Sequence, residues 1–328
     1  MRGFTAPCFA LLSLVCACDS QRQPSRASAS SSAKIAAPPA PSMQVSSATP
    51  KRLTTLPVSA YRVSLAMDDE AVYLMTSNAA YRLVDGEPVN GLRLDLGIGP
   101  VLTRTAFVFW ANGAIWSAPK SGGDRRELAK FPHQPQYFVS SGEAIAWVDQ
   151  ADDGQYTIQT LDGSTPRVLL SSKGEIRALD MIGDAIYFVQ RPVDDSWRIG
   201  FVHRDGREPR FTVAKKGRAP SQLTGSDSIY YFDLDTKRIL RLSLDLQQEV
   251  VQSTDLVCSP MHASTRIYCG CVEGLFDVDE QTHQPRVLVH DRPGSITSVT
   301  SDSKAVAWTV DVGSDRLAVD FLPASSAL

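Results

Sequence analysis

The 328-residue chain lacks a long apolar run and lacks an excess of basic residues. No stretch of eighteen or more consecutive apolar residues occurs, so we predict no transmembrane helix. Lysine and arginine number 33 against 36 aspartates and glutamates, a formal net charge of −3. Loss of Arg2 with a signal peptide would make the charge 32 − 36 = −4. Nucleic-acid-binding proteins usually carry a basic excess, so we expect no nucleic-acid partner.

Catalytic and cofactor-binding motifs are also missing. There is no G-x-S-x-G nucleophile motif, no P-loop and no dinucleotide-binding glycine fingerprint. Histidine occurs five times, without an H-E-x-x-H spacing or a similar ligand pattern. We therefore predict no catalytic residue, no metal site and no cofactor, and we expect the histidines in solvated turns and loops. They are His133, His203, His262, His283 and His290.

What the chain does contain is a series of short β-hairpins, of which Ser228–Leu244 is the clearest. Ile229–Phe232 consists of β-forming residues and is too short for a helix. Asp233–Lys237 has turn chemistry, because aspartate side chains bond nearby backbone amides. Arg238–Leu242 then alternates polar and apolar residues, as a strand with one buried face does.

Seven copies of this hairpin recur along the chain. Each first strand begins with a β-branched residue and has an aromatic residue within two positions, and a second series of strands follows the first. The first positions are 36, 37, 41, 43, 38 and 39 residues apart, which is typical of propeller blades. We predict an all-β, seven-bladed β-propeller of four-stranded blades over residues 51–328, with a β-sandwich fold as the alternative. The leading residues are Val72, Val108, Ile145, Ile186, Ile229, Ile267 and Val306.

The seventh repeat ends on its third strand, near 317–322, and has no fourth strand after it. The segment Lys51–Leu56 precedes the first repeat and has a strand-like sequence. We expect Arg52–Leu56 to supply the outer strand of the seventh blade, which joins the first and last blades of the ring.

Residues 1–18 have the features of an export signal, with a positive start and the short apolar core Phe4–Val15. Val15–Cys18 resembles the lipobox of bacterial lipoproteins, and the resemblance implies lipidation of Cys18. An ordinary signal peptide cut after Ala17 is the alternative. We expect an exported protein held at the bacterial cell envelope by its N-terminal lipid, in the periplasm or on the outer surface.

Residues 19–50 form a predicted disordered tether. Serine, alanine and proline make up 21 of these 32 residues, so the segment has too little apolar content to form a core. Its proline-rich parts keep it partly extended. Such a tether would hold the propeller off the membrane surface.

Three cysteines lie in the sixth repeat, Cys258, Cys269 and Cys271. A turn near 262–265 places Cys258 opposite Cys269, and one register further it opposes Cys271. Because disulfides are common in exported proteins, we predict a cross-strand bond from Cys258 to Cys269, with Cys271 as the alternative partner. A metal site formed by the three cysteines and His262 is a third possibility, although it needs four converging ligands, and unpaired thiols are a fourth.

Two units, 106–123 and 229–245, resemble the repeats of YWTD-type and TolB-like propellers, although the strict YWTD tetrad is absent. The likeness covers 51–328 and rests on an aromatic hairpin of the form I-Y-W, turn, I-x-R. Those families mostly bind proteins or peptides on one rim or on the central face. The resemblance therefore implies a propeller with a protein or peptide partner, although a fold does not fix a function.

In the usual strand order, one face of the propeller carries the loops between second and third strands and the connections between blades. Trp197 is the leading candidate for an exposed contact there, because exposed aromatics often anchor interfaces. The alternative is that it folds back on its own blade. The acidic pairs in these loops are turn formers or, alternatively, calcium ligands. The other binding-face candidates are Asp152, Asp153, Asp194, Asp195, His133, Lys215, Lys216, Arg218, His290 and Arg292.

These observations favour a lipid-anchored envelope propeller that acts as a non-catalytic binding scaffold for a protein or peptide. The alternative is an envelope enzyme, a lyase or hydrolase, with a site in the central channel. Titratable residues gathered at the channel mouth would favour the enzyme, and a rim of mixed charge would favour the scaffold. A third hypothesis, a polysaccharide-binding surface protein, calls for rows of exposed aromatics.

Overall fold

The computed structural model describes residues 49–56, 63–76, 79–84, 87–93, 98–192, 194–207, 209–254, 258–264, 266–271, 274–278, 285–290, 294–302, 304–313 and 316–323. The predicted signal peptide with Cys18, and the tether before Thr49, lie outside the described residues. The described part consists of strands and turns, and it contains no apolar helix of the length needed to cross a membrane. The all-β prediction is confirmed.

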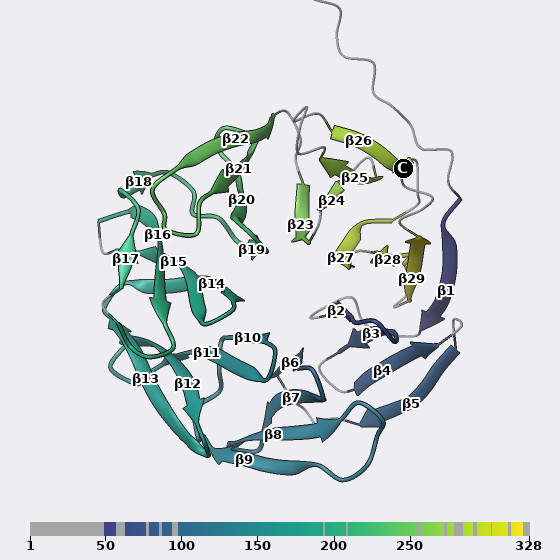
Figure 1. The fold of residues 1–328 in the computed structure, drawn as a ribbon, viewed down its shortest axis with the longest axis horizontal. Helices are drawn as coiled ribbons and strands as arrows, with labels where there is room; N and C mark the ends of the chain where they lie inside the picture. Colours follow the sequence, from purple (N-terminus) through teal and green to yellow (C-terminus); the bar gives the residue numbers. More distant parts are fainter. Residues whose placement is uncertain are drawn as a thin grey trace, which may run out of the picture. The chain divides into compact units, whose positions relative to one another are not determined.

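The strands form seven antiparallel sheets that follow one another around a ring (Figure 1). Each sheet is one blade, and the prediction of a seven-bladed propeller with four-stranded blades is confirmed. Blades 1 to 3 are β2 Ser64–Met67, β3 Val72–Met75, β4 Ala79–Val84 and β5 Glu87–Arg93; β6 Ile98–Leu102, β7 Ala106–Ala111, β8 Ala114–Pro119 and β9 Arg126–Lys130; β10 Tyr137–Ser141, β11 Ala144–Gln150, β12 Tyr156–Asp162 and β13 Thr165–Ser172.

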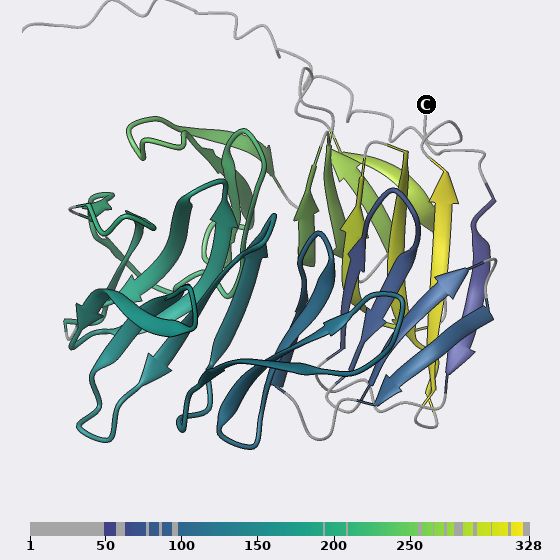
Figure 2. The same ribbon diagram turned by 60° about the horizontal axis from the view of Figure 1, so that its bottom comes forward.

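The remaining blades follow the same plan, except that the outer strand of blade 4 is divided into β17 and β18, which both pair with β16. In Figure 2 the outer strands are tilted relative to the inner ones, as the twist of β-sheets requires. Blades 4 to 7 are β14 Glu175–Ile182, β15 Ala185–Arg191, β16 Ser196–His203, β17 Arg210–Phe211 and β18 Lys215–Lys216; β19 Leu223–Gly225, β20 Ile229–Asp233, β21 Arg238–Leu242 and β22 Glu249–Thr254; β23 Cys258–Ala263, β24 Ile267–Cys271, β25 Gly274–Val278 and β26 Pro285–His290; β27 Ile296–Ser301, β28 Ala305–Asp311, β29 Leu317–Pro323 and β1 Lys51–Leu56.

The first strand of the chain closes the ring. β1 pairs antiparallel with β29, so that Lys51 lies opposite Phe321 and the seventh blade gains its fourth strand. The Arg52 guanidinium holds this strand through its Nε, which lies 2.9 Å from Oδ1 of the buried Asp320. The predicted closure by Arg52–Leu56 is confirmed, with Lys51 as one additional strand residue.

The hydrophobic core is divided among the seven contacts between neighbouring blades, which we call seams. Each of the seven clusters of buried apolar residues joins two adjacent blades. Large aromatic side chains such as Trp147, Trp197 and Trp308 are almost fully buried in these seams. The aromatic residue near the start of each second strand is therefore core packing, because it fills the space between two sheets.

The turns between the inner and second strands lie on one face of the ring, which we call the lower face. The turns between the second and third strands lie on the opposite, upper face, because neighbouring strands of a blade are antiparallel. Lys51, at the start of β1, lies toward the lower face, since its partner Phe321 pairs with Ala307 close to the inner turn of blade 7.

Side chains of several inner strands connect one blade to the next around the ring. In blades 4, 5 and 6, the inner-strand residue that lies opposite the tyrosine of the second strand hydrogen-bonds to the backbone of the next blade's inner strand. Gln222 makes a further contact of this kind, since its amide bonds both backbone groups of Met261. The three equivalent bonds join Asp180 to Gly225, Thr224 to Ala263 and His262 to Ser301.

The disulfide joins Cys258 to Cys271, and Cys269 is a free, buried thiol. The first of the two predicted pairings, Cys258 with Cys269, is therefore wrong and the alternative is correct. A bulge between Cys258 and Met261 shifts the register, so that Met261 faces Cys269. Burial raises the pKa of the Cys269 thiol. His262 lies within β23, and no group of three or more His, Cys, Asp or Glu side chains in the described residues could hold a metal ion.

Candidate functional site

Trp197, the leading sequence candidate for an exposed contact, is buried. Its side chain is 2% exposed and packs edge-on against Tyr231 in the seam between blades 4 and 5, with ring centroids 5.9 Å apart. Trp197, Ile199 and Phe201 alternate along β16, and all three face this seam. The prediction of an exposed contact is wrong, and the alternative, in which the indole folds into the blades, is correct. The alternation of these three residues was the sequence signal for it.

The acidic candidates on the upper face shape the turns that carry them. Asp153 Oδ1 accepts a hydrogen bond from the backbone N–H two residues on, at 2.9 Å. Asp194 Oδ1 accepts one from Ser196 Oγ at 2.6 Å, which holds the pKa of Asp194 below its ordinary value. Asp152 and Asp195 are exposed beside them. Asp153 and Asp194 therefore stabilise the turns in which they lie.

The basic and histidine candidates are distributed over several blades instead of meeting at one point. Lys215 Nζ lies 2.6 Å from a Glu249 carboxylate oxygen, an ion pair that joins blade 4 to blade 5. His133 Nδ1 lies 3.3 Å from Oδ2 of the buried Asp149. The remaining candidates are Lys216, Arg218 and His290, which are exposed, and Arg292, which lies outside the described residues.

The histidines lie in strands more often than the sequence predicted. His133 is in a connection between blades, as expected. For three histidines the expected position in a turn or loop is wrong, because they lie within strands. These strands extend further than the apolar pattern of the sequence indicated. The three histidines are His203 in β16, His262 in β23 and His290 in β26, while His283 lies outside the described residues.

A group of residues that the sequence did not single out lies on the upper face, at the seam between blades 3 and 4. We call it the mouth cluster, and it consists of Tyr137, Tyr156, Glu175, Arg177 and Arg191. Arg177 Nε lies 2.7 Å from Glu175 Oε1, and Arg191 Nη1 lies 3.9 Å from the second oxygen of that carboxylate. Both tyrosines are within electrostatic range of Arg177. Burial, and then the charge of Glu175, raise the pKa of Tyr156.

The backbone beneath Arg177 is strained. Ala178 has φ = +45°, and the register of β14 against β15 shifts between Arg177 and Leu179, which is a β-bulge. A left-handed conformation costs a non-glycine residue about 1–2 kcal/mol. Bulges redirect the side chains beside them, and backbone strain of this kind is concentrated at functional sites. Ala178 is buried in the seam between blades 4 and 5, so packing holds the bulge in place.

The mouth cluster presents a rim of mixed charge and aromatic character. Tyr137 is 37% exposed and the Arg177 side chain 39%, so both are accessible from the upper face. The charges are paired, since Arg191 also lies 3.7 Å from Asp195. Tyrosine and arginine are the residue types that most often carry binding energy at protein interfaces. The carboxylate of the cluster, Glu175, lies between the guanidinium groups of Arg177 and Arg191.

The mouth cluster had only weak signals in the sequence. Tyr137 opens an inner strand, and Glu175 and Arg177 alternate with the buried Ile176, so each is individually recognisable as a strand residue on an outward position. Their convergence depends on the packing of β10 and β12 against β14 of the next blade. Alanine has no preference for a positive φ, so the bulge at Ala178 could not be predicted from the sequence.

Two titratable residues of the inner strands have shifted pKa values. Burial raises the pKa of Asp180 to about 6, although backbone N–H groups of Met181 and Gly225 oppose the shift. Burial lowers the pKa of His262 to about 4. They belong to blades 4 and 6, and each is bonded to the backbone of the following blade.

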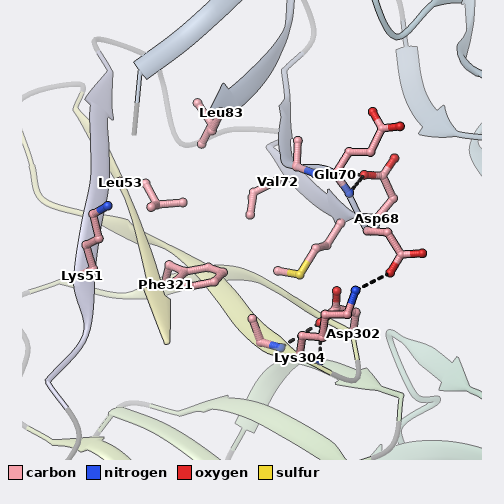
Figure 3. Close-up of a pocket in the computed structure, with 13 residues that line it drawn as sticks. Lys51, Leu53, Asp68, Glu70, Val72, Leu83, Asp302, Lys304 and Phe321 are labelled. Atoms are coloured by element: carbon pink, nitrogen blue, oxygen red, sulfur yellow. Dashed lines mark hydrogen bonds and ion pairs between the residues drawn. The ribbon is translucent and has the colours of Figure 1, made fainter. Parts of the chain in front are cut away.

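A cavity of about 340 Å³, which we call the seam pocket, lies on the lower face between blades 7 and 1 (Figure 3). Its floor is apolar and its rim is charged. The floor is made by Leu53, Met67, Ala71, Val72, Leu83, Ala305 and Phe321, and the rim by Lys51, Asp68, Asp69, Glu70, Asp302 and Lys304.

No protein-family model matches the chain, and no curated protein sequence matches it either. Among solved structures, an oligogalacturonate lyase in complex with manganese shares the fold with a TM-score of 0.68 at 12% identity, over 86% of this chain and 95% of that one. An oligogalacturonate lyase from Vibrio parahaemolyticus gives a TM-score of 0.66 at 11% identity, over 86% and 96%. A chain of the nidogen/laminin complex gives 0.48 at 15%, over 69% and 92%. At these identities the chain is similar to the two lyases in its propeller fold alone.

Proposed function

We propose that this protein is an exported β-propeller scaffold that binds a protein or peptide at the mouth cluster. The observation that carries the proposal is the half-exposed pair Tyr137 and Arg177, which stands over the strained residue Ala178. A rigid site loses little conformational freedom when a partner binds, which favours affinity. The paired, mixed charges of the rim support recognition rather than acid–base chemistry.

The second part of the proposal is the lipid anchor at Cys18. The Cys258–Cys271 disulfide supports an oxidising compartment, where exported proteins mature. The tether would reach the propeller at Lys51, which lies toward the lower face.

The test is retrieval of a partner from detergent-solubilised envelope by the full-length protein. A double variant, Tyr137→Ala with Arg177→Ala, removes the two exposed groups of the mouth cluster. Arg207→Ala is the matched control, because Arg207 is exposed in a turn of the lower face. A saturable partner retained by the wild type and the control, and lost by the double variant, is the expected result. A partner retained by all three would contradict the mouth cluster, and the absence of any partner would contradict the scaffold.

A second candidate function is an enzyme with its site in the central channel. It draws support from the fold shared with oligogalacturonate lyases and from Asp180 and His262, because shifted pKa values are concentrated at active sites. The manganese of the similar lyase has no counterpart in the donor groups here, since the described residues contain no cluster of three or more potential metal ligands. We therefore derive no step through a metal.

The enzyme alternative is tested by incubating the full-length protein with oligogalacturonate and following the unsaturated product that an elimination creates. Activity that is lost in both Asp180→Asn and His262→Gln would establish the channel site. If the wild-type protein forms no unsaturated product from oligogalacturonate, the enzyme alternative is contradicted for this substrate.

A further inference from the structure

The seam that contains the pocket differs from the others in the residues that are buried in it. Among the described residues, each of the other six seam clusters contains at least one buried aromatic side chain. The buried members of the cluster between blades 7 and 1 are all aliphatic, and its two aromatic neighbours, Tyr81 and Phe321, are only partly buried. Protein interiors are close-packed, so aliphatic residues in place of an aromatic ring leave unfilled volume. The cavity of about 340 Å³ lies within the size range of ligand pockets, about 300–1,000 Å³.

The unfilled space is open at one side and apolar inside. Phe321 and Leu53 are only partly buried, and they line the pocket and pack against the cluster (Figure 3). Met67 does the same from β2. Ala305 is buried at the edge of the floor. The space that the partly buried Phe321 leaves unfilled in this seam is therefore accessible from the lower face.

Four carboxylates and two lysines line the rim, and Lys120 from outside it pairs with one of these carboxylates, Asp68, at 2.5 Å. Asp69 is 87% exposed and pairs with Lys304 at 3.1 Å, and Glu70 is 72% exposed and pairs with Arg82 at 3.3 Å. Exposed ion pairs of this kind are weak. A cationic group from outside can therefore replace these partners at little cost.

A polypeptide is the occupant that matches the edge of the pocket. Lys51 and Leu53 line the pocket from β1, and β1 is the last strand of its sheet. The edge of a terminal strand offers backbone groups to an extended chain, and pockets beside it select side chains. A segment laid along this edge would bring one side chain over the floor and its neighbours over the charged rim.

We propose that the seam pocket binds a polypeptide segment in which an aromatic residue is flanked by basic residues. The aromatic ring would occupy the unfilled volume of the seam, and the flanking cations would meet Asp69 and Glu70. The proposal is independent of the mouth cluster, which lies on the opposite face. Because the pocket is lined by both the first and the last blade, such a ligand would also stabilise ring closure.

The test is isothermal titration of the full-length protein with three acetylated and amidated peptides, Lys-Trp-Lys, Lys-Ala-Lys and Glu-Trp-Glu. We expect Lys-Trp-Lys to bind at least about tenfold more tightly than each of the other two, and to raise the melting temperature. Equal binding of Lys-Trp-Lys and Lys-Ala-Lys would overturn the aromatic part of the proposal. Equal binding of Lys-Trp-Lys and Glu-Trp-Glu would overturn the cationic part.

Variants locate the binding in the pocket. Ala305→Leu places additional atoms on the floor, and we expect it to weaken Lys-Trp-Lys by about tenfold or more without lowering the melting temperature. The side chain of Glu70 is exposed, so Glu70→Lys does not affect packing, and we expect it to weaken the binding of Lys-Trp-Lys by about fivefold. Asp227→Lys is the matched control, because Asp227 lies exposed in the equivalent turn of blade 5. Unchanged binding in Glu70→Lys, or an equal loss in Asp227→Lys, would refute the seam pocket as the site.

Discussion

Leu53 in β1 and Gln252 in β22 occupy the same position of two different blades. Each is the unpaired residue of a bulge in the outer strand, where two outer-strand residues face a single residue of the third strand. The bulge recurs in three further blades, where the unpaired residues are Leu128, Leu169 and Leu288. These leucines all belong to the seam with the following blade. In four of these five blades the bulged residue is therefore a leucine directed into the seam, and Gln252 is the exception among the five.

The exception predicts a stabilising substitution, Gln252→Leu. Gln252 is 0% exposed, and neither its amide nitrogen nor its amide oxygen has a hydrogen-bond partner in the described part of the chain. A buried polar group without a partner costs about 1–3 kcal/mol, and an apolar residue of similar size removes that cost. We expect Gln252→Leu to raise the free energy of unfolding by about that amount, measured by urea denaturation.

The reciprocal substitution is the control. Leu288→Gln places an amide at the equivalent position of blade 6, where Leu288 is buried, and is expected to destabilise by about 2–4 kcal/mol. A loss of stability in Gln252→Leu would show instead that the native amide has a partner, such as an ordered water molecule.

Ring closure predicts an asymmetric effect of two arginine substitutions. Arg52→Ala leaves the carboxylate of Asp320, which is 0% exposed, without its Arg52 guanidinium. Because Arg52 itself is partly exposed, we expect a loss of about 1–2 kcal/mol, less than for a fully buried pair. Arg82→Ala, which removes a pair with the exposed Glu70, should cost less than about 1 kcal/mol. Thermal denaturation that gave equal losses would argue against Arg52 as the closing contact.

Deletion of 51–56 should reduce the stability of the whole ring.

The strained bulge predicts that Ala178→Gly is stabilising. Glycine adopts φ = +45° without steric cost, so relief of the strain is expected to add about 1 kcal/mol to the free energy of unfolding. The matched control is Ala146→Gly in the regular strand β11, where glycine should destabilise by about 0.5–1 kcal/mol or more. Chemical denaturation of both variants tests this difference. Destabilisation of the same size in both would mean that the Ala178 backbone stores no strain.

Much of the fold could be predicted from the sequence because every blade repeats one local pattern. A β-branched residue, an aromatic residue and a turn place each second and third strand, and the spare strand Lys51–Leu56 indicated closure. The bulges were not predictable in this way, because an inserted residue changes the register without changing the apolar pattern. The inner-strand bulge at Cys258–Met261 is why Cys258 pairs with Cys271 rather than with Cys269.

The candidate site was less accessible to prediction than the fold. Trp197 is close in sequence to the predicted loop that carries Asp194 and Asp195, but its alternation with Ile199 and Phe201 directs it into a seam. Tyr137 and Arg177 come from different blades, and their proximity follows from the packing of one sheet on the next. A convergence of this kind depends on tertiary structure, which composition and spacing do not encode.

The inner strands predict two opposite dependences of stability on pH. The pKa of Asp180 is raised from 3.8 to about 6, so between these values the folded state keeps a proton that the unfolded state releases. Its contribution is therefore present below pH 3.8 and is lost as the pH rises through 6. The pKa of His262 is lowered from 6.5 to about 4, so in the corresponding window the unfolded state holds the additional proton. Its contribution is present above pH 6.5 and is lost as the pH falls through 4.

The two effects have similar size and opposite sign, so they nearly cancel in the wild type between pH 4 and 6. A shift of about 2 pKa units corresponds to about 3 kcal/mol for each group. We expect Asp180→Asn, which keeps an acceptor oxygen for Met181 and Gly225, to gain stability relative to the wild type as the pH rises from 4 to 7. His262→Gln should lose stability relative to the wild type over the same range. Urea denaturation of the three proteins at pH 4, 5, 6 and 7 measures both slopes. Parallel pH profiles would show that neither group is titrated differently in the folded and unfolded states.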